Sequence, residues 1–281
     1  MILKSLASFC KDCIIKIKGT TQQCECEQTD TSSVTSSATT SEPVNEVVET
    51  KNEPVSLTIK TSPYSCSHGK KFKKTPTWIV VHYTACANVS AKSMCKAMQN
   101  NTGASSHFYI DDTDVYSAVP LEYVAWHVGD GQCKQPSAYS KKSLEELSNY
   151  KCNDWRYDLA AQNHMKWKAN NDDFTGNGVS IGVDICVWKR STATKKATDK
   201  DWYCKDAAID NLAKTVAHLA KKYNIRLEHI IRHGDASGKP CPRPMISLPG
   251  DISNNDKKWD EFKSKVADYM DREIAVKTVK G

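Results

Sequence analysis

Residues 77–83 read TWIVVHY, an unbroken run of apolar and β-branched residues that closes on a histidine and a tyrosine. A second run of the same kind, VSIGVDICV, occupies residues 179–187. Continuous apolar runs of this length are typical of strands that are covered on both faces. The two runs therefore predict two buried strands in the interior of a layered domain.

Helical patterns alternate with the strands along the chain. Within residues 205–223, apolar side chains recur at steps of three and four, and lysines gather toward the end, which predicts an amphipathic helix. Strands that alternate with helices favour an α/β domain, which we place at residues 56–275. The other expected elements are helices at 91–99 and 257–270, a hairpin of strands 106–110 and 115–119 around the turn DDTD, and a short strand at 229–232.

The N-terminal part has a different composition. Residues 28–55 are rich in Ser, Thr and Glu and poor in large apolar residues, so they cannot offset the entropy of ordering and are expected to be a disordered linker. Residues 1–27 form a short head with closely spaced thiols. These thiols either bind one structural zinc ion or belong to a loosely ordered tail. They are Cys10, Cys13, Cys24 and Cys26.

The bulk numbers limit the classes of protein that fit. The chain has 281 residues, of which 39% are hydrophobic and 26% charged, as in an ordinary globular protein. No apolar run is long enough to span a bilayer. Lysines and an aspartate interrupt the apolar stretches of residues 1–18, so we expect no signal peptide. Phe9 precedes Cys10 where a lipoprotein signal would carry a small residue, so we expect no lipid anchor either. Without a leader, the twelve cysteines are expected to be free thiols or metal ligands.

Net charge is unevenly distributed. It is +6 for the whole chain, +3 for residues 1–24 and −6 for residues 25–54, which leaves +9 for residues 55–281. A basic globular part suits an anionic partner such as a cell-wall polymer, although it also serves plain solubility.

A candidate metal site lies in residues 231–242, IRHGDASGKPCP. His233 ends an expected strand, and a loop with glycine and proline brings Cys241 back toward it. Such a loop can place an imidazole and a thiolate about 3–4 Å apart, as shared tetrahedral coordination requires. A third ligand must come from elsewhere, and His82 at the end of TWIVVHY is the best candidate. Three protein ligands leave one position for water, the pattern of a catalytic zinc ion.

Five blocks in this order resemble one known family. The sequence is similar to the zinc-dependent N-acetylmuramoyl-L-alanine amidases, which include phage endolysins and peptidoglycan recognition proteins. The resemblance covers about residues 75–245 and implies a mixed central β-sheet flanked by helices, with a zinc groove on one face. The blocks are WIVVHYTA at 78–85, ASSHFYI at 104–110, VAWHVG at 124–129, SIGVD at 180–184 and the loop from 233 to 241.

The resemblance implies a role for each matching position. His82, His233 and Cys241 correspond to the ligands of one catalytic Zn²⁺. Asp184 stands where many members carry glutamate as general base; aspartate is one methylene shorter, and a strand carboxylate paired for packing is the alternative. Lys239 matches a lysine that stabilises the developing oxyanion, and its alternative is a surface loop cation.

Two further positions bear on the substrate. His127 matches a histidine expected to contact substrate in the groove; the alternative is a buried, hydrogen-bonded histidine behind Trp126. Ser106 occupies a position where some members carry a tyrosine that serves in acid–base chemistry, which shifts weight to Asp184. The polar stretch 130–178 is an insertion in the domain, either a flap over the site or a surface addition with its own apolar cluster.

The function implied by the resemblance is hydrolysis of the amide bond between N-acetylmuramic acid and L-alanine in bacterial peptidoglycan. We expect a monomer, made in the cytoplasm and released to the wall as a phage endolysin is. A non-catalytic peptidoglycan-recognition module is the alternative, but such relatives typically lack the cysteine ligand, and Cys241 is present. A disulfide-rich secreted protein is a third reading, and nucleic-acid binding is disfavoured because basic residues do not cluster with aromatic platforms.

Overall fold

A computed structural model describes residues 53–128, 176–191, 196, 198–237, 239–248, 251 and 254–281. The expectations for the head at 1–27, for nearly all of the linker at 28–55 and for most of the insertion at 130–178 lie outside these residues.

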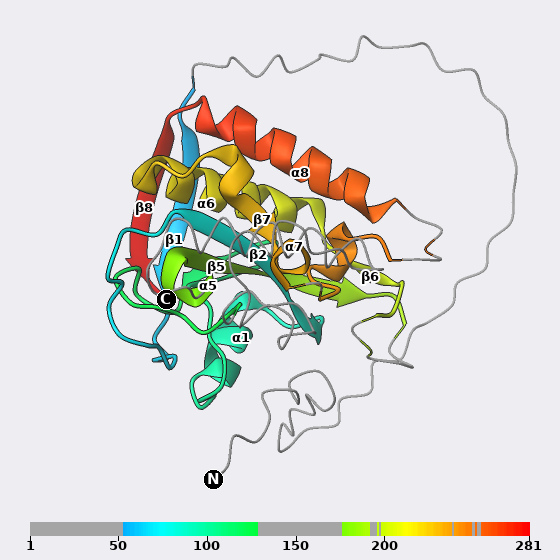
Figure 1. The fold of residues 1–281 in the computed structure, drawn as a ribbon, viewed down its shortest axis with the longest axis horizontal. Helices are drawn as coiled ribbons and strands as arrows, with labels where there is room; N and C mark the ends of the chain where they lie inside the picture. The colour runs from blue at the N-terminus through cyan, green and yellow to red at the C-terminus, as the bar shows by residue number, and fades with distance from the viewer. Residues whose placement is uncertain are drawn as a thin grey trace, which may run out of the picture. The chain divides into compact units, whose positions relative to one another are not determined.

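The described strands form one mixed sheet in the order β7-β2-β5-β3-β4-β1-β8, with β6 beside β5 (Figure 1). The β3–β4 and β5–β6 pairs are antiparallel, and the other pairs are parallel. The strands are β1 (Val55–Thr61), β2 (Trp78–Ala87), β3 (Phe108–Ile110), β4 (Val115–Ser117), β5 (Ser180–Lys189), β6 (Trp202–Tyr203), β7 (Ile230–Arg232) and β8 (Ile274–Lys280).

Helices cover both faces of this sheet, which confirms the predicted fold class. Helices α6 (Asp206–Tyr223) and α8 (Asn255–Met270) pack against each other along one side, whereas α1 (Ala91–Met98) contacts β3 and β4 (Figure 1). All three helices were expected from the sequence. The remaining short helical segments are α5 (Gly176–Val179), α7 (His233–Ser237), η1 (Leu227–His229) and η2 (Arg243–Met245).

Alternation along β2 and β5 decides which side chains reach the functional face. In β2, Ile79 and Val81 belong to the large core beneath α6, while Val80 packs in a separate small cluster. Because successive strand residues point to opposite faces, His82 projects away from α6. The same alternation in β5 sends Val183 into the core and Asp184 to the opposite face.

Strand β8 was not predicted from the sequence. This strand pairs in parallel with β1 from Val55 opposite Ile274 to Thr61 opposite Lys280, and so extends beyond position 275. Every residue of β8 is exposed or only partly buried, and lysine and threonine interrupt its apolar residues. Its pattern was therefore too polar to stand out as a buried strand.

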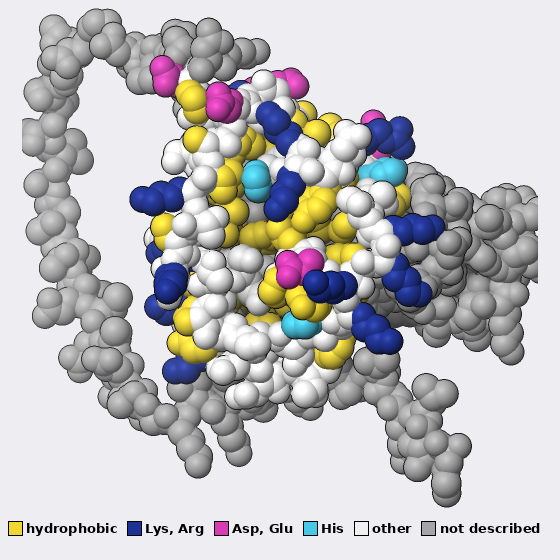
Figure 2. Space-filling model, turned by 90° about the vertical axis from the view of Figure 1, so that its left-hand side faces the viewer, with side chains coloured by type: hydrophobic (Ala, Val, Ile, Leu, Met, Phe, Trp, Pro, Cys, Tyr) yellow, Lys and Arg dark blue, Asp and Glu magenta, His cyan; other side chains and the backbone are white. Residues whose placement is uncertain are grey.

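Lysine and arginine side chains surround an apolar band on the face drawn in Figure 2, in keeping with the basic charge of residues 55–281. Within the described part of the chain, none of the helices combines the length and the apolar character that crossing a bilayer demands.

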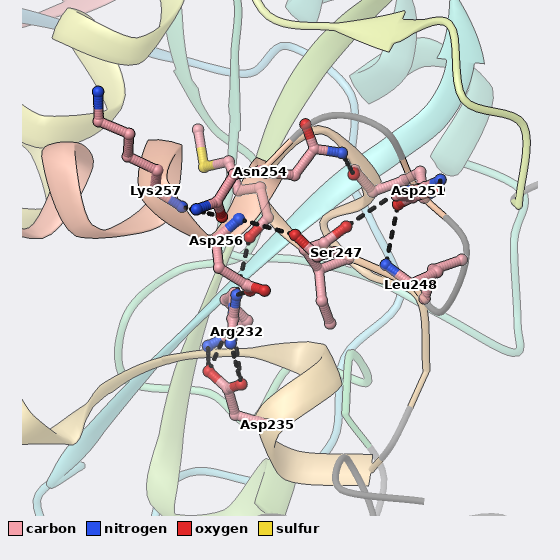
Figure 3. A network of polar contacts seen from close by, with 12 residues as sticks. Arg232, Asp235, Ser247, Leu248, Asp251, Asn254, Asp256 and Lys257 are labelled. Atoms are coloured by element: carbon pink, nitrogen blue, oxygen red, sulfur yellow. Dashed lines mark hydrogen bonds and ion pairs between the residues drawn. The ribbon is translucent and has the colours of Figure 1, made fainter.

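A buried ion-pair network ties the end of β7 to α8 (Figure 3). The guanidinium of Arg232 binds the Asp235 carboxylate at 2.8 Å, pairs with Asp256 at the start of α8 and donates to the Met245 carbonyl at 2.9 Å. Arg232 and Asp235 are 6% and 5% exposed, so their ion pair compensates two charges that are held away from water. The network fixes the chain just before and just after His233.

We expect Arg232→Ala to lower the free energy of unfolding by about 3–5 kcal/mol, because it removes the guanidinium that compensates the charge of the buried Asp235 carboxylate. Chemical denaturation of the purified protein measures the loss. Arg226→Ala is the matched control, since Arg226 pairs with Glu228 in the open, and it should change stability little. Equal losses for the two variants would contradict the importance of the network.

Candidate metal centre

Strand register brings the candidate residues together. In the parallel pairing of β2 with β5, His82 lies opposite Asp184, and in the pairing of β2 with β7, Val81 lies opposite Arg232. His233 follows Arg232 directly and begins α7. The sheet therefore places one histidine at the centre, a carboxylate on one side and a second histidine on the other.

The loop after α7 folds back onto its own beginning. The Gly234 amide donates to the Cys241 carbonyl at 2.7 Å, and the Cys241 amide donates to the Lys239 carbonyl at 2.8 Å. A Cβ on Gly234 would stand 2.7 Å from the Lys239 carbonyl oxygen and 2.3 Å from an Ile246 methyl. Only glycine allows this approach, which returns Cys241 to the neighbourhood of His233.

His82, His233 and Cys241 form a cluster of metal-ligand type. One donor atom from each residue lies within 4.8 Å of the others, and the Cys241 Sγ is 3.9 Å from His82 Nδ1. The two imidazole rings meet edge to face with centroids 4.6 Å apart. Donors of a tetrahedral zinc ion, bound at about 2.0–2.3 Å, stand at separations close to these.

The chemistry of the donors also fits a zinc ion. Among the residues that the structure describes, none hydrogen-bonds the buried Nε2 of His233. Burial, and then the neighbouring charges, hold the pKa values of His82 and His233 well below the ordinary value. Both rings are therefore neutral near pH 7, which is the form that binds metals. Two neutral imidazoles and a thiolate suit zinc.

Asp184 lies next to this cluster on the same face of the sheet. Burial raises the pKa of its carboxyl group to about 7, and the Ser106 hydroxyl partly opposes that rise. A carboxyl group that titrates near neutral pH can both accept and return a proton, as general acid–base catalysis requires.

Lys239 is exposed, in the loop between His233 and Cys241. Its positive charge is one cause of the lowered pKa values of both His82 and His233. The loop thus carries the candidate cation between two of the candidate ligands, His233 and Cys241.

His127 is half-buried, and both of its ring nitrogens are occupied by protein atoms. Nδ1 lies 3.0 Å from His82 Nε2, and Nε2 lies 3.3 Å from both the carbonyl and the hydroxyl of Ser180. Burial lowers its pKa well below the ordinary value. The expected contact with substrate stays a prediction, and the hydrogen-bonded alternative describes what the ring does here.

Three residues that hold His127 were not predicted from the sequence. Ser180 accepts its Nε2 proton, Asn177 accepts the backbone N–H groups of His127 and Val128 at 3.0 and 2.9 Å, and Gly182 lies against its ring. Ser180 and Gly182 stood inside the SIGVD block but looked like ordinary strand residues. Asn177 carried no signal at all.

Comparison with known proteins gives a consistent result. The family model described as N-acetylmuramoyl-L-alanine amidase matches residues 72–244. The N-acetylmuramoyl-L-alanine amidase XlyA of Bacillus subtilis (strain 168) is 26% identical over 207 residues, 73% of this chain and 48% of that protein. The N-acetylmuramoyl-L-alanine amidase CwlA of the same strain is 29% identical over 171 residues, which are 60% of this chain and 44% of that protein.

The chain thus spans about half the length of the curated relatives it matches. Among solved structures, the catalytic domain of XlyA aligns with 74% of this chain and 98% of its own, at a TM-score of 0.45 and 23% identity.

The raised pKa of Asp184 predicts a cost in stability. The carboxyl group has a pKa of about 7 in the folded state, against an ordinary 3.8. The folded state therefore loses stability as the pH rises from about 4 to 7, because ionisation of a buried carboxyl group is unfavourable. We expect metal-free Asp184→Asn, which stays neutral, to exceed the wild-type protein in stability by roughly 2–4 kcal/mol at pH 8.

Urea unfolding of chelator-treated protein between pH 4 and pH 8 measures this difference. The gap should close near pH 4, where the wild-type carboxyl is protonated too. Asp268→Asn, at an exposed position on α8, should not reproduce it. A gap that did not change with pH would show that Asp184 is not held in its neutral form.

Proposed function

Since the chain belongs to the N-acetylmuramoyl-L-alanine amidase family, we propose that it is a zinc hydrolase acting on bacterial peptidoglycan. It cleaves the amide bond between N-acetylmuramic acid and L-alanine, and His82, His233 and Cys241 hold the one zinc ion. The observation that carries the proposal is the convergence of those three donor atoms within 4.8 Å of one another, from two separate parts of the chain.

The three ligands set the charge of the site. Cys241 contributes a thiolate, and the two histidines are neutral, so a divalent ion bound there keeps a net charge of about +1. When bound, zinc supplies a Lewis acid that lowers the pKa of water and polarises a carbonyl group. Three protein ligands would leave such an ion one further coordination position for water or substrate.

Asp184 moves the proton. A carboxylate oxygen of Asp184 takes the proton of the attacking water and then delivers it to the amine that leaves the scissile amide. Its neighbour in the sheet register is His82, so the carboxylate and the ligand lie on adjacent strands of one face. The pKa of about 7 suits both halves of this exchange.

Lys239 stabilises charge on the substrate. As water adds to the amide carbon, the carbonyl oxygen becomes negative, and the Lys239 ammonium group pairs with it. Groups of this kind typically contribute about 3–4 kcal/mol to the transition state. The exposed position of Lys239 lets it reach a polymer that approaches from solvent.

The basic charge of the domain supports the cell wall as its partner. The net charge of +9 on residues 55–281 attracts an anionic cell wall. We propose that the protein works as a monomer and lyses the wall in the manner of a phage endolysin.

Replacement of the thiolate ligand tests the site. We expect Cys241→Ser to lose retained zinc and to abolish the lysis of purified bacterial walls, because a neutral hydroxyl is a poor zinc ligand. Zinc content by atomic absorption and the fall in turbidity of a wall suspension are the two measurements. Cys204→Ser, on a half-buried cysteine outside the ligand cluster, is the matched control and should keep both properties.

The wild-type protein must release L-alanine amino groups without new reducing sugar ends, which separates an amidase from a glycosidase. Wall binding without release would assign the protein to the non-catalytic recognition modules. A Cys241→Ser variant that is metal-free and fully active would refute the zinc site.

Lys239→Ala should separate catalysis from metal binding. We expect kcat to fall by roughly 10²–10³-fold, as for the loss of one oxyanion donor. Zinc affinity should stay the same or rise, because a positive charge near the ion is removed. Steady-state kinetics and a zinc competition assay test both points, with Lys277→Ala on exposed β8 as the control. A loss of zinc affinity would make Lys239 a structural residue instead.

A further inference from the structure

The proposed mechanism leaves His127 without a task, yet its ring is among the most constrained in the site. It contacts a ligand histidine through Nδ1, at 3.0 Å from His82 Nε2. Its other nitrogen, Nε2, faces two oxygens of Ser180 at 3.3 Å. A ring held at both nitrogens by protein atoms has only its carbon edges left for a substrate.

The hydrogen bonds around Ser180 decide which atom donates in each hydrogen bond from Ser180 through His127 to His82. The Ser180 hydroxyl donates to the Gly176 carbonyl at 2.5 Å, so its proton is committed, and toward His127 it presents only lone pairs. The Ser180 carbonyl is an acceptor as well. With two acceptors at Nε2, His127 carries its proton there, and its Nδ1 is a bare acceptor.

The protonation of His127 also determines the tautomer of His82. Because His127 Nδ1 accepts, His82 Nε2 must carry the proton that is donated. A neutral imidazole has only one N–H, so His82 Nδ1 is left with its lone pair free. That nitrogen is the one 3.9 Å from the Cys241 sulfur, in the ligand cluster.

We propose that His127 is a positioning residue that locks His82 in the tautomer whose Nδ1 binds the metal. The inference rests on the proposed function only in taking His82 as a zinc ligand. His127 also orients the His82 ring, since the hydrogen bond joins two rings that meet edge to face at a centroid distance of 5.1 Å.

The fold is built to hold His127 in this orientation. Asn177 binds the backbone amides of His127 and Val128, which fixes the segment that carries the ring. Gly182 leaves room for the ring on β5, because a Cβ there would stand 2.5 Å from His127 Cγ. A methyl group at position 182 would therefore displace the His127 ring, while the three proposed metal ligands keep all their atoms.

Hydrogen bonds to the outer nitrogen of a ligand histidine raise its basicity and fix its direction, and their loss typically costs 10–100-fold in metal affinity. We expect His127→Leu and Gly182→Ala to weaken zinc binding by roughly that factor. His127→Asn keeps an acceptor oxygen near the place of Nδ1, so it should stay within about threefold of the wild type. His218→Leu, on α6, is the matched control.

Zinc dissociation constants come from competition with a chromogenic chelator on the folded full chain, and circular dichroism confirms folding. Long-range ¹H–¹⁵N correlation spectra of the wild-type zinc protein give an independent readout, since they report which nitrogen of each histidine is protonated. We expect protons on Nε2 of both His82 and His127. This readout needs no variant, so a failure of His127→Leu to fold does not block the test.

Three results would overturn the inference. One is a proton on Nδ1 of His127 in the spectra. Another is wild-type zinc affinity in both His127→Leu and Gly182→Ala. The third is an increase in KM for His127→Leu with unchanged zinc affinity, which would assign the ring to substrate contact. A wild-type protein that binds no zinc overturns the proposed function itself, whereas the other results leave that function standing.

Discussion

Parallel pairing of β2 with β5 on one side and β7 on the other is the constraint on which the site depends. This register sets His82 beside Asp184 and brings β7 to an end at the level where His233 can reach the same space. A slip of one residue in β2 would turn His82 into the core beneath α6 and bring Val81 or Tyr83 to the functional face. Such a slip would bury the His82 imidazole among the apolar side chains of that core, and the cost of burying an unpaired polar group disfavours it.

Several polar groups of the site are buried away from water, and this burial determines their charge states. Desolvation keeps the histidines neutral and raises the pKa of Asp184 to about 7. The protein thus presents lone pairs and a carboxyl group that titrates near neutral pH instead of a cluster of fixed charges. A divalent ion entering such a site meets donors that need not first lose a proton, apart from the Cys241 thiol.

Much of this could be read from the sequence because it depends on local patterns. Strong apolar runs located β2 and β5, helical periodicity located α6, and spacing with family resemblance located His82, His233 and Cys241. What escaped depends on contacts between distant segments. Ser180, Gly182 and Asn177 act on His127 only after the sheet has formed, and nothing in their own neighbourhoods marks them. Strand β8 escaped because it lies at the sheet edge, where half-exposed residues suffice.

The β1–β8 pairing has a consequence for how the domain is made. Val55 begins the first of the described strands, but its partner on one side, Ile274, belongs to β8, the last of them along the chain. Contacts so distant in sequence close late and slow the search for the native state. During translation β1 must wait with an open edge, which is a hazard for mispairing with another chain. The polar, lysine-bearing character of β8 then leaves the finished sheet with an edge that does not invite further strands.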